Sequence, residues 1–407
     1  MRDDKANGLE RLRVVYLSRG FGDYLSELMN AMADRNDVFY VCSRLDEPVA
    51  GLLREGVRVF RSGAPRVRSP WNLAFLRKIG RFLREVNPHI VHFQSGTIWE
   101  LLLSPFFRGR PMVLTRHDVV PHARNRRGRP LVVRLASNRE LRLAAGIIVH
   151  SERLAAQCRS AHERLVRGKP IEAIPLGALT RYGVGEAAVE ARAKRVLFFG
   201  TVDLYKGLEH LAAAWGLVRQ AVPGARLTVA GATRLPDYYR GLFCAYPEVE
   251  CRFWFQSAAE TRELFTSSDA IVLPYVEASQ SAVLQIAFAF GLPAAVSRVG
   301  GLADVVKDQY NALAIEPSDT RQVAAAIIRL LTDAGLRARL IQNMVEERNT
   351  IYSWKSIAAT TDQFYRRLRQ TDEHPHAPAD LPKQRFRPHG CGPRNRSGHS
   401  RGDPASD

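Results

Sequence analysis

The chain has 407 residues, of which 46% are hydrophobic and 25% charged, with a formal net charge of +18. This length predicts two domains, since single cores stop growing at about 250–300 residues. The composition is globular and excludes fibrous and wholly disordered proteins. The richest apolar window, residues 98–107, contains Glu100 and is too short for a membrane span. The N-terminus has no signal-peptide core, so we expect a cytoplasmic protein.

The cysteines and the basic residues further limit the possible classes of protein and of binding partner. Five cysteines without a Cys-x-x-Cys pair favour neither a disulfide framework nor a zinc site. Residues 61–169 contain 22 Lys or Arg against 6 Asp or Glu, which is +16 of the net charge. This asymmetry predicts a polyanionic partner, namely nucleic acid, acidic lipid headgroups or a phosphate-bearing substrate.

Short β-branched runs alternate with helical patterns throughout, which is typical of βα units and parallel sheets. In the first half we expect helices that include residues 23–33 and 72–86, and strands at 13–18, 38–42, 57–60, 90–93, 112–115 and 146–150. The pattern breaks at Ile174-Pro175-Leu176-Gly177 and a polar stretch follows to Lys194. We interpret this break as the interdomain linker.

A second βα series follows the linker. We expect strands at 195–199, 226–230, 251–255, 270–273 and 294–297, and helices at 207–222, 258–267, 282–290, 302–307, 320–334 and 354–369. The chain therefore divides into an N-terminal domain (1–177), a linker (178–194), a C-terminal domain (195–350), a C-terminal helix (351–370) and a tail (371–407). The tail is rich in Pro, Gly, His and Arg and is predicted to be disordered.

The first strand runs into a glycine-containing turn, Ser18-Arg19-Gly20-Phe21-Gly22. Glycines between a strand and a helix let backbone amides approach a phosphate. Leu25 stands where the dinucleotide fingerprint has its third glycine. A plain tight turn and a phosphate contact are therefore both open for Gly20 and Gly22.

Two segments of the second half carry more specific chemistry. Gly200 and Thr201 follow a strand, and Lys206 precedes the next helix, where it can reach a diphosphate or be a solvated loop lysine. In the segment 274–285, Glu277 follows another strand and Ser281 precedes the free amides of a helix start. That segment suits hydroxyls and phosphate oxygens, although a helix cap and an exposed loop acid are the alternatives.

From residue 13 to residue 369 the chain resembles the retaining glycosyltransferases of family 4, which have the GT-B fold. The resemblance is carried by Ile174-Pro175-Leu176-Gly177, Phe199-Gly200 with Tyr205-Lys206-Gly207, the block 274–285, Gly291-Leu292-Pro293 with Val299-Gly300-Gly301-Leu302, Arg116-His117-Asp118 and Val149-His150-Ser151. It implies an α/β fold of two Rossmann-like domains whose parallel sheets face each other across a cleft.

The resemblance also implies roles for individual residues. Lys206 would hold the donor diphosphate, and Glu277 and His117 would lie at the transferred sugar as the catalytic pair. The other donor-binding residues would be Gly20, Gly22, Gly200, Thr201, Ser281, Ala282, Val283 and Gln285. Two positions depart from the family pattern, since Thr201 replaces an arginine and Gln285 replaces the glutamate that holds the ribose.

We therefore expect a sugar to pass from a nucleotide diphosphate donor to a glycan or lipid-linked acceptor with retention of configuration. The chain has no Asp-x-Asp motif, so we expect no metal and no further cofactor. The basic first domain is predicted to meet an anionic membrane or a phosphate-bearing acceptor. A nucleic-acid partner is disfavoured because the aromatics follow core patterns. The alternatives are an inactive nucleotide-sugar-binding partner protein and an epimerase.

Overall fold

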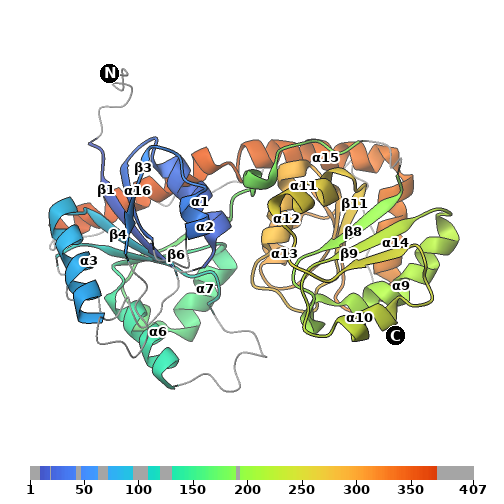
Figure 1. Cartoon of the computed structure of the whole chain (residues 1–407), viewed down its shortest axis with the longest axis horizontal. Coiled ribbons are helices and arrows are strands. Elements are labelled where there is room, and N and C mark those ends of the chain that lie inside the picture. The colour runs from blue at the N-terminus through green and yellow to red at the C-terminus, as the bar shows by residue number, and fades with distance from the viewer. Residues whose placement is uncertain are drawn as a thin grey trace, which may run out of the picture.

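The computed structural model (Figure 1) describes residues 10–18, 20–42, 47–62, 72–94, 109–119, 131–188 and 193–373. The described chain forms two parallel sheets with helices on their faces, as the sequence predicts. The expected site residues all fall within these ranges. Residues 374–407, which make up most of the predicted tail, and Arg124, Arg126, Arg127 and Arg129 lie outside them.

The first sheet has seven parallel strands in the order β3-β2-β1-β4-β5-β6-β7. Its strands are β1 (Arg13–Ser18), β2 (Asp37–Cys42), β3 (Val57–Arg61), β4 (Ile90–Gln94), β5 (Met112–Thr115), β6 (Gly146–Val149) and β7 (Ile171–Ala173). The helices between them are α1 (Gly22–Met32), α2 (Glu47–Ala50), α3 (Asn72–Val86), α6 (Leu131–Leu143), α7 (Glu152–Ala161) and α8 (Glu163–Val166).

Both faces of this sheet are buried, because successive side chains of a strand point to opposite faces. Val14 and Tyr16 of β1 pack with α1 and with α16 (Trp354–Glu373). Val15 and Leu17 pack with α3, α6 and α7. The C-terminal helix thus belongs to the first sheet, although the sequence between β7 and α16 forms the other half of the molecule (Figure 1).

The second sheet has six parallel strands in the order β10-β9-β8-β11-β12-β13. Its strands are β8 (Arg195–Phe199), β9 (Arg226–Ala230), β10 (Val249–Arg252), β11 (Ala270–Leu273), β12 (Ala294–Ser297) and β13 (Leu313–Ile315). Its helices are α9 (Leu208–Ala221), α10 (Pro236–Leu242), α11 (Ala258–Thr266), α12 (Ala282–Phe290), α13 (Leu302–Val305), α14 (Thr320–Thr332) and α15 (Ala334–Asn349). The short 3-10 helices are η3 (Thr180–Tyr182) and η4 (Leu204–Lys206).

Several expected elements were wrong in extent. The strand expected at 251–255 is β10 at Val249–Arg252, because its partner β9 ends at Ala230, opposite Arg252. Trp254 and Phe255 are aromatic and so favoured a longer strand, but they lie beyond the paired residues and are 49% and 86% exposed. The strands β7 and β13 and the helix α15 were not expected. The last helix continues to Glu373, past the predicted start of the tail at Thr371.

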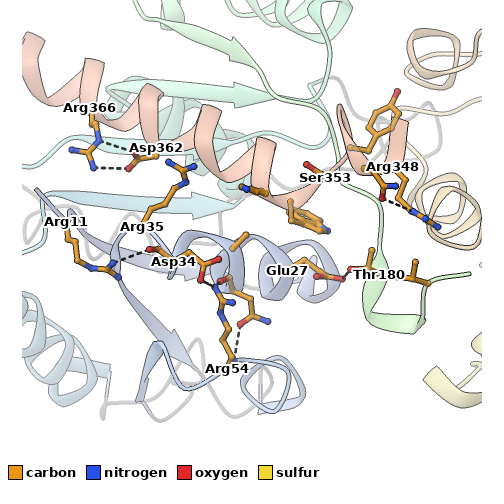
Figure 2. Close-up of a pocket in the computed structure, with 17 residues that line it drawn as sticks. Arg11, Glu27, Asp34, Arg35, Arg54, Thr180, Arg348, Ser353, Asp362 and Arg366 are labelled. Atoms are coloured by element: carbon orange, nitrogen blue, oxygen red, sulfur yellow. Dashed lines mark hydrogen bonds and ion pairs between the residues drawn. The ribbon is translucent and has the colours of Figure 1, made fainter. Parts of the chain in front are cut away.

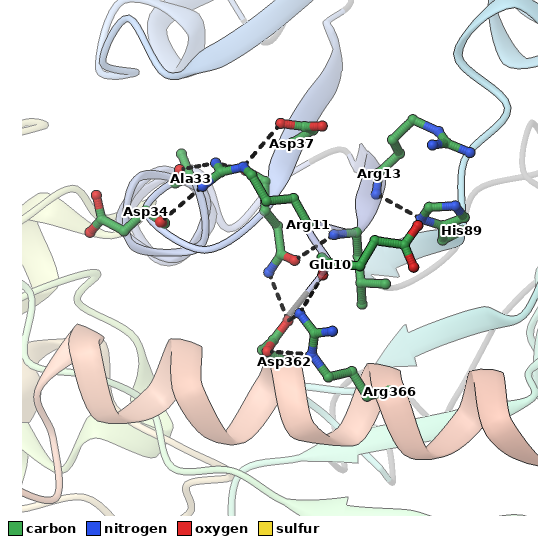
Figure 3. A network of polar contacts seen from close by, with 11 residues as sticks. Glu10, Arg11, Arg13, Ala33, Asp34, Asp37, His89, Asp362 and Arg366 are labelled. Carbon is green, nitrogen blue, oxygen red and sulfur yellow. Dashed lines mark hydrogen bonds and ion pairs between the residues drawn. The ribbon is translucent and has the colours of Figure 1, made fainter. Parts of the chain in front are cut away.

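Polar contacts with residues of the first domain hold α16 in place (Figure 3). Asn36 donates to the Asp362 carboxylate over 2.8 Å, and Asp362 also pairs with Arg366 at 2.9 Å. Arg366 donates in turn to the carbonyl of Glu10. In the core, Tyr365 contacts the ring of His92 and lies 3.2 Å from the hydroxyl of Tyr16.

Candidate active site

The expected site residues follow strands at the two switch points of the sheets. In each sheet the strand order reverses, at β1/β4 in the first and at β8/β11 in the second. Ligands of open parallel sheets bind outside the carboxyl ends of strands at such points. Gly20 follows β1 and Gln94 ends β4, while Gly200 follows β8 and Glu277 lies beyond β11.

Lys206 ends the turn η4, which begins with Asp203 accepting a hydrogen bond from the Leu204 amide. Its ammonium lies 3.6 Å from the centroid of the Tyr275 ring, within cation–π range. Burial lowers the pKa of Lys206 from 10.5 to about 8, and Tyr205 and Asp203 partly oppose that shift. The amine is therefore a desolvated cation held on an aromatic face.

The Lys206 turn is joined to the loop that carries Glu277. The amides of Val276 and Glu277 both approach the carbonyl of Tyr205, at 2.9 and 3.4 Å. Gly207 has φ 68°, and a Cβ there would lie 2.0 Å from the carbonyl oxygen of Pro274. Only glycine permits this approach. Glu277 is exposed, so its carboxylate faces solvent beside the lysine turn.

The N-terminus of α12 forms the next wall. Ser281 caps the helix by accepting from the Leu284 amide, and the amides of Ala282 and Val283 have no hydrogen-bond partner in the described chain. These amides are free to bind an anion. Gln285 is 1% exposed, and its side-chain oxygen has no partner among the described residues. A buried acceptor without a partner is uncommon in folded proteins, which makes Gln285 a candidate to bind a hydroxyl donor.

Glycine is required at position 200 because its φ is 108°. It is also required at position 231, because a Cβ there would lie 1.9 Å from the carbonyl oxygen of Gly200. A Cβ at Gly200 itself would lie 3.1 Å from the Val283 side chain, so the β8 turn contacts the start of α12. Thr201 is exposed beside this turn. The structure thus gathers Gly200, Lys206, Glu277 and the start of α12 on two touching loops, the one after β8 and the one after β11.

On the first domain, His117 lies at the carboxyl end of β5 and is 6% exposed. Its ring stacks on Phe21 with centroids 3.7 Å apart, and Tyr24 meets its edge. Its Nδ1 lies 2.8 Å from Nε2 of His150, and its Nε2 lies 3.3 Å from Oε1 of Gln94. Burial and the neighbouring histidines hold the pKa of His117 well below its usual range, so the ring is neutral.

The hydrogen-bond chain determines the tautomer of His117. Nδ1 of His150 donates to the carbonyl of Ile174 at 3.0 Å, so its Nε2 accepts from Nδ1 of His117. Nε2 of His117 is then a lone-pair acceptor, so the Gln94 amide, whose Oε1 is placed 3.3 Å away, must turn its otherwise unpartnered nitrogen toward His117 to donate. A sugar hydroxyl can donate to this atom only by displacing Gln94.

The two glycines of the turn after β1 are required for different reasons. Gly20 has φ 84°, and a Cβ there would meet nothing within 4 Å, so space is open in front of it. A Cβ at Gly22 would lie 2.6 Å from Val49, so Gly22 is small because α1 packs on α2. Between them Phe21 adopts φ 55°, a conformation uncommon outside glycine, and covers His117.

The two halves meet at the mouth of the cleft. The hydroxyl of Ser279 donates to the carboxylate of Asp118, which joins the β11 loop to the β5 loop. Arg153 of α7 pairs with Asp304 of α13 at 2.9 Å. His117 is adjacent to Asp118, so these contacts bring its loop next to the Glu277 loop.

The described residues lack two kinds of feature. They contain no group of three or more His, Cys, Asp or Glu side chains arranged to hold a metal. They also contain no helix with the length and apolarity needed to cross a membrane. The expectation of a metal-free reaction stays a prediction.

The fold and this arrangement define the class: the protein has the GT-B architecture, two Rossmann-like sheets whose switch points face one cleft. Residues 18–180 match the family model described as Glycosyltransferase Family 4, and residues 193–333 match Glycosyl transferases group 1. The chain therefore belongs with the GT-B glycosyltransferases that resemble family 4.

Individual proteins agree with this assignment. The chain is 30% identical over 176 residues to an uncharacterized glycosyltransferase, MJ1607, of Methanocaldococcus jannaschii, which is 42% of this chain and 45% of that protein. It is 27% identical over 304 residues to D-inositol 3-phosphate glycosyltransferase of Rhodococcus jostii, 65% and 67% of the two chains. The chain spans less than half the length of most curated relatives it matches.

A solved structure, Anabaena HepE in complex with UDP, superposes with a TM-score of 0.64 at 13% identity, covering 88% of this chain and 100% of that one. At this identity the match shows the fold alone.

Some residues of the site were not predicted from the sequence. Tyr275, under the Lys206 ammonium, lies two residues after the end of β11, and Gln94 ends β4 at the switch point. Strand ends are therefore the signal that points to both residues. Phe21 was part of the glycine motif, but stacking on His117 depends on two loops that are far apart in the sequence.

Proposed function

We propose that this protein transfers a hexose from UDP-hexose or GDP-hexose to a glycan or lipid-linked acceptor with retention of configuration, in polysaccharide or glycoconjugate synthesis. One observation carries the proposal: Lys206, a desolvated cation on the Tyr275 ring, is tied through Tyr205 to the loop that bears Glu277. A diphosphate at Lys206 and the free amides of α12 would place the transferred sugar next to Glu277.

In the proposed reaction the sugar–phosphate bond breaks and the diphosphate leaves with the pair of electrons. Lys206 and the amides of Ala282 and Val283 stabilise the charge that develops on the phosphate oxygens. The leaving diphosphate accepts the acceptor's proton on the same face of the sugar, so no protein base is needed. The side-chain oxygen of Gln285 accepts from a ribose hydroxyl, which supplies its missing partner.

The acceptor is proposed to bear phosphate or to lie on an anionic membrane, to which the protein docks peripherally. Helices α3 and α6 cover the same face of the first sheet. The exposed basic side chains of these two helices are Arg77, Lys78, Arg81, Arg84, Arg134, Arg139 and Arg142. The α6 side chains of Val133 and Leu135 are 42% and 58% exposed. Basic residues near an anionic surface contribute about 1 kcal/mol each, and a D-inositol 3-phosphate glycosyltransferase is among the relatives.

A second candidate is a nucleotide-sugar-binding partner protein without turnover. Two departures from the family pattern favour it. Thr201 stands in place of a cationic arginine, and Gln285 stands in place of an anionic glutamate. Thermal unfolding against UDP, GDP, ADP and CMP identifies the nucleotide, because a ligand at 100 times its Kd stabilises by about 2.7 kcal/mol.

Two assays then separate the candidates and test the acceptor side. Hydrolysis of the matching sugar nucleotide without an acceptor is expected for the enzyme, with the first-formed sugar keeping the donor's anomeric configuration by NMR. Binding without any hydrolysis or transfer would favour the partner protein. Flotation of the protein with anionic and neutral vesicles at low and high salt tests membrane docking. If the protein does not float with anionic vesicles at low salt, it does not dock on membranes, and a soluble acceptor is favoured.

A further inference from the structure

A cavity of about 750 Å³ lies apart from the donor loops, between α1 and the segments that connect the two halves (Figure 2). Its walls come from α1, the segment after η3, the end of α15 and the start of α16. No residue of the loops that carry Lys206 and Glu277 lines it. The donor site therefore does not account for this cavity.

The cavity sits where the chain crosses twice between the halves. The amide of Ala178, on the outgoing crossing, donates to the carbonyl of Tyr352 on the returning one at 2.9 Å. Trp354 donates from its indole to the carbonyl of Ala178 at 2.7 Å. Thr180 and Ser353, one from each crossing, line the cavity. A molecule bound there touches both connections.

The acidic side chains of the cavity are already satisfied by protein groups. Asp34 pairs with Arg54, and Asp362 pairs with Arg366. Glu27 accepts from the Thr180 hydroxyl at 2.9 Å and from the amide of Arg181 at 2.6 Å. Burial raises the pKa of Glu27, which reduces its tendency to carry a charge.

Three basic side chains of the cavity form no salt bridge in the described chain, although the charge of Arg348 interacts with Glu186. Arg348 donates only to the carbonyls of Gly185 and Ala289 and to the side chain of its neighbour. Neither Arg35 nor Lys355 makes a side-chain hydrogen bond or ion pair with described residues. In Figure 2 the Arg35 side chain extends from the end of α1 toward α16. The cavity therefore holds uncompensated positive charge.

We propose that this cavity binds a small phosphate-bearing anion, inorganic phosphate or a phosphorylated sugar, with Arg35 and Lys355 as its direct ligands. A guanidinium and an ammonium are the side chains that proteins use for phosphate, the first as a planar fork and the second as a point charge. The volume falls in the range of small-molecule sites. The site is independent of the donor proposal, because it shares no residue with it.

Calorimetric titration of the full chain with inorganic phosphate and with glucose 6-phosphate tests the proposal. The variant Arg35→Gln/Lys355→Gln is expected to weaken binding by about tenfold or more, on the strength of charge-assisted hydrogen bonds. Its thermal midpoint without ligand should match the wild type, since neither side chain has a partner to lose. Tighter binding of glucose 6-phosphate than of phosphate identifies a sugar phosphate, and equal binding identifies the phosphate group alone.

Two control variants separate this cavity from the donor loops and from general charge. Lys206→Ala, which removes the donor cation, and Arg321→Gln, which removes an exposed cation of α14, should both bind like the wild type. The proposal is overturned if neither anion binds at 10 mM, if the double variant binds normally, or if Lys206→Ala abolishes binding. It is also overturned if Arg321→Gln weakens binding as much as the double variant does.

Discussion

Lys206 makes donor affinity dependent on pH. Its pKa is lowered to about 8, and only the protonated amine attracts a diphosphate. Nucleoside diphosphate affinity should therefore be constant below about pH 7 and fall roughly tenfold per pH unit above 8. Calorimetry from pH 6.5 to 9.5 measures this. Lys206→Ala should weaken binding at pH 7 by about tenfold or more, with a small change in stability.

Lys206→Arg is the matched variant for that experiment. It keeps a cation that does not titrate, so its binding should lose the pH dependence even if the affinity changes. A wild-type affinity that does not change across this range would remove Lys206 from the donor site.

Glu277 is expected to affect turnover rather than nucleotide affinity. Its exposed carboxylate lies beyond the lysine turn, where it orients sugar hydroxyls in the proposed complex. Glu277→Ala should lower kcat by a factor of about 10–100, on the strength of hydrogen bonds to a charged group, and Glu277→Gln less. The Kd for nucleoside diphosphate should equal the wild-type value in both variants. Wild-type kinetics in Glu277→Ala would make this residue an ordinary loop acid.

The buried histidines predict a loss of stability in mild acid. Burial lowers the pKa of His92 to about 3 and of His150 to about 4, and that of His117 well below 6.5. As pH falls from 6.5 toward 4, the unfolded chain binds protons that the folded chain does not. His92 and His150 therefore each remove about 2 kcal/mol of stability by pH 5, and His117 acts in the same direction.

Urea unfolding at pH 7.5, 6 and 5 checks the histidine prediction. His150→Gln should reduce the slope of stability against pH, whatever it costs at neutral pH, because one titrating group is gone. His210→Gln on α9 serves as a control outside the cluster. Equal slopes in the wild type and His150→Gln would contradict the prediction.

At the scale of elements, the turn η4 is set in place by one glycine. An alanine at Gly207 would place its Cβ against the carbonyl of Pro274 and would adopt an unfavourable φ of 68°. Gly207→Ala should separate the Lys206 turn from the Glu277 loop, and so weaken diphosphate binding and lower stability by about 1–3 kcal/mol. Calorimetry and urea unfolding measure the two effects.

Gly224→Ala is the control for backbone strain. Gly224 has a similar φ of 81°, but a Cβ there meets nothing within 4 Å. It should cost about 1 kcal/mol and leave binding unchanged. If both variants bind diphosphate normally, the Pro274 contact does not position the site.

Elements with a clear period were predictable, and those stabilised by tertiary contacts were not. The strands β1, β5, β8, β9, β11 and β12 lie where their apolar runs place them. The helix α15 was not expected because its buried side includes Arg337, Glu347 and Arg348, which interrupt an apolar stripe. Arg337 is satisfied by the carbonyls of Asp269 and Leu330, partners that only the fold supplies.

At the scale of the molecule, the first domain depends on the end of the chain. Tyr365 contacts His92 in the core, and Gly146 leaves room for Phe364 and Leu368 of α16. A chain ending at residue 350 should therefore be strongly destabilised or fail to fold, while one ending at residue 373 should unfold like the full chain. Thermal unfolding followed by circular dichroism compares them.

Tyr365→Phe gives a milder test of the same contact. It keeps the ring and removes the hydroxyl, which leaves a polar atom of His92 without a partner and should cost about 1–3 kcal/mol. Wild-type stability in both the 350 truncation and this variant would make α16 dispensable.

The sequence by itself determined the two βα series and the order of the motifs, because these depend on local periodicity and on strand ends. It therefore located Lys206, Glu277 and the start of α12, all of which follow strands of one domain. The strand order, and with it the two switch points, came only from the tertiary structure. Only the tertiary structure decided which partners the side chains take. The stacking of Phe21 on His117, the lysine on Tyr275 and the return of α16 to the first sheet join residues far apart in sequence. Such contacts depend on how loops and helices pack, which no local pattern records.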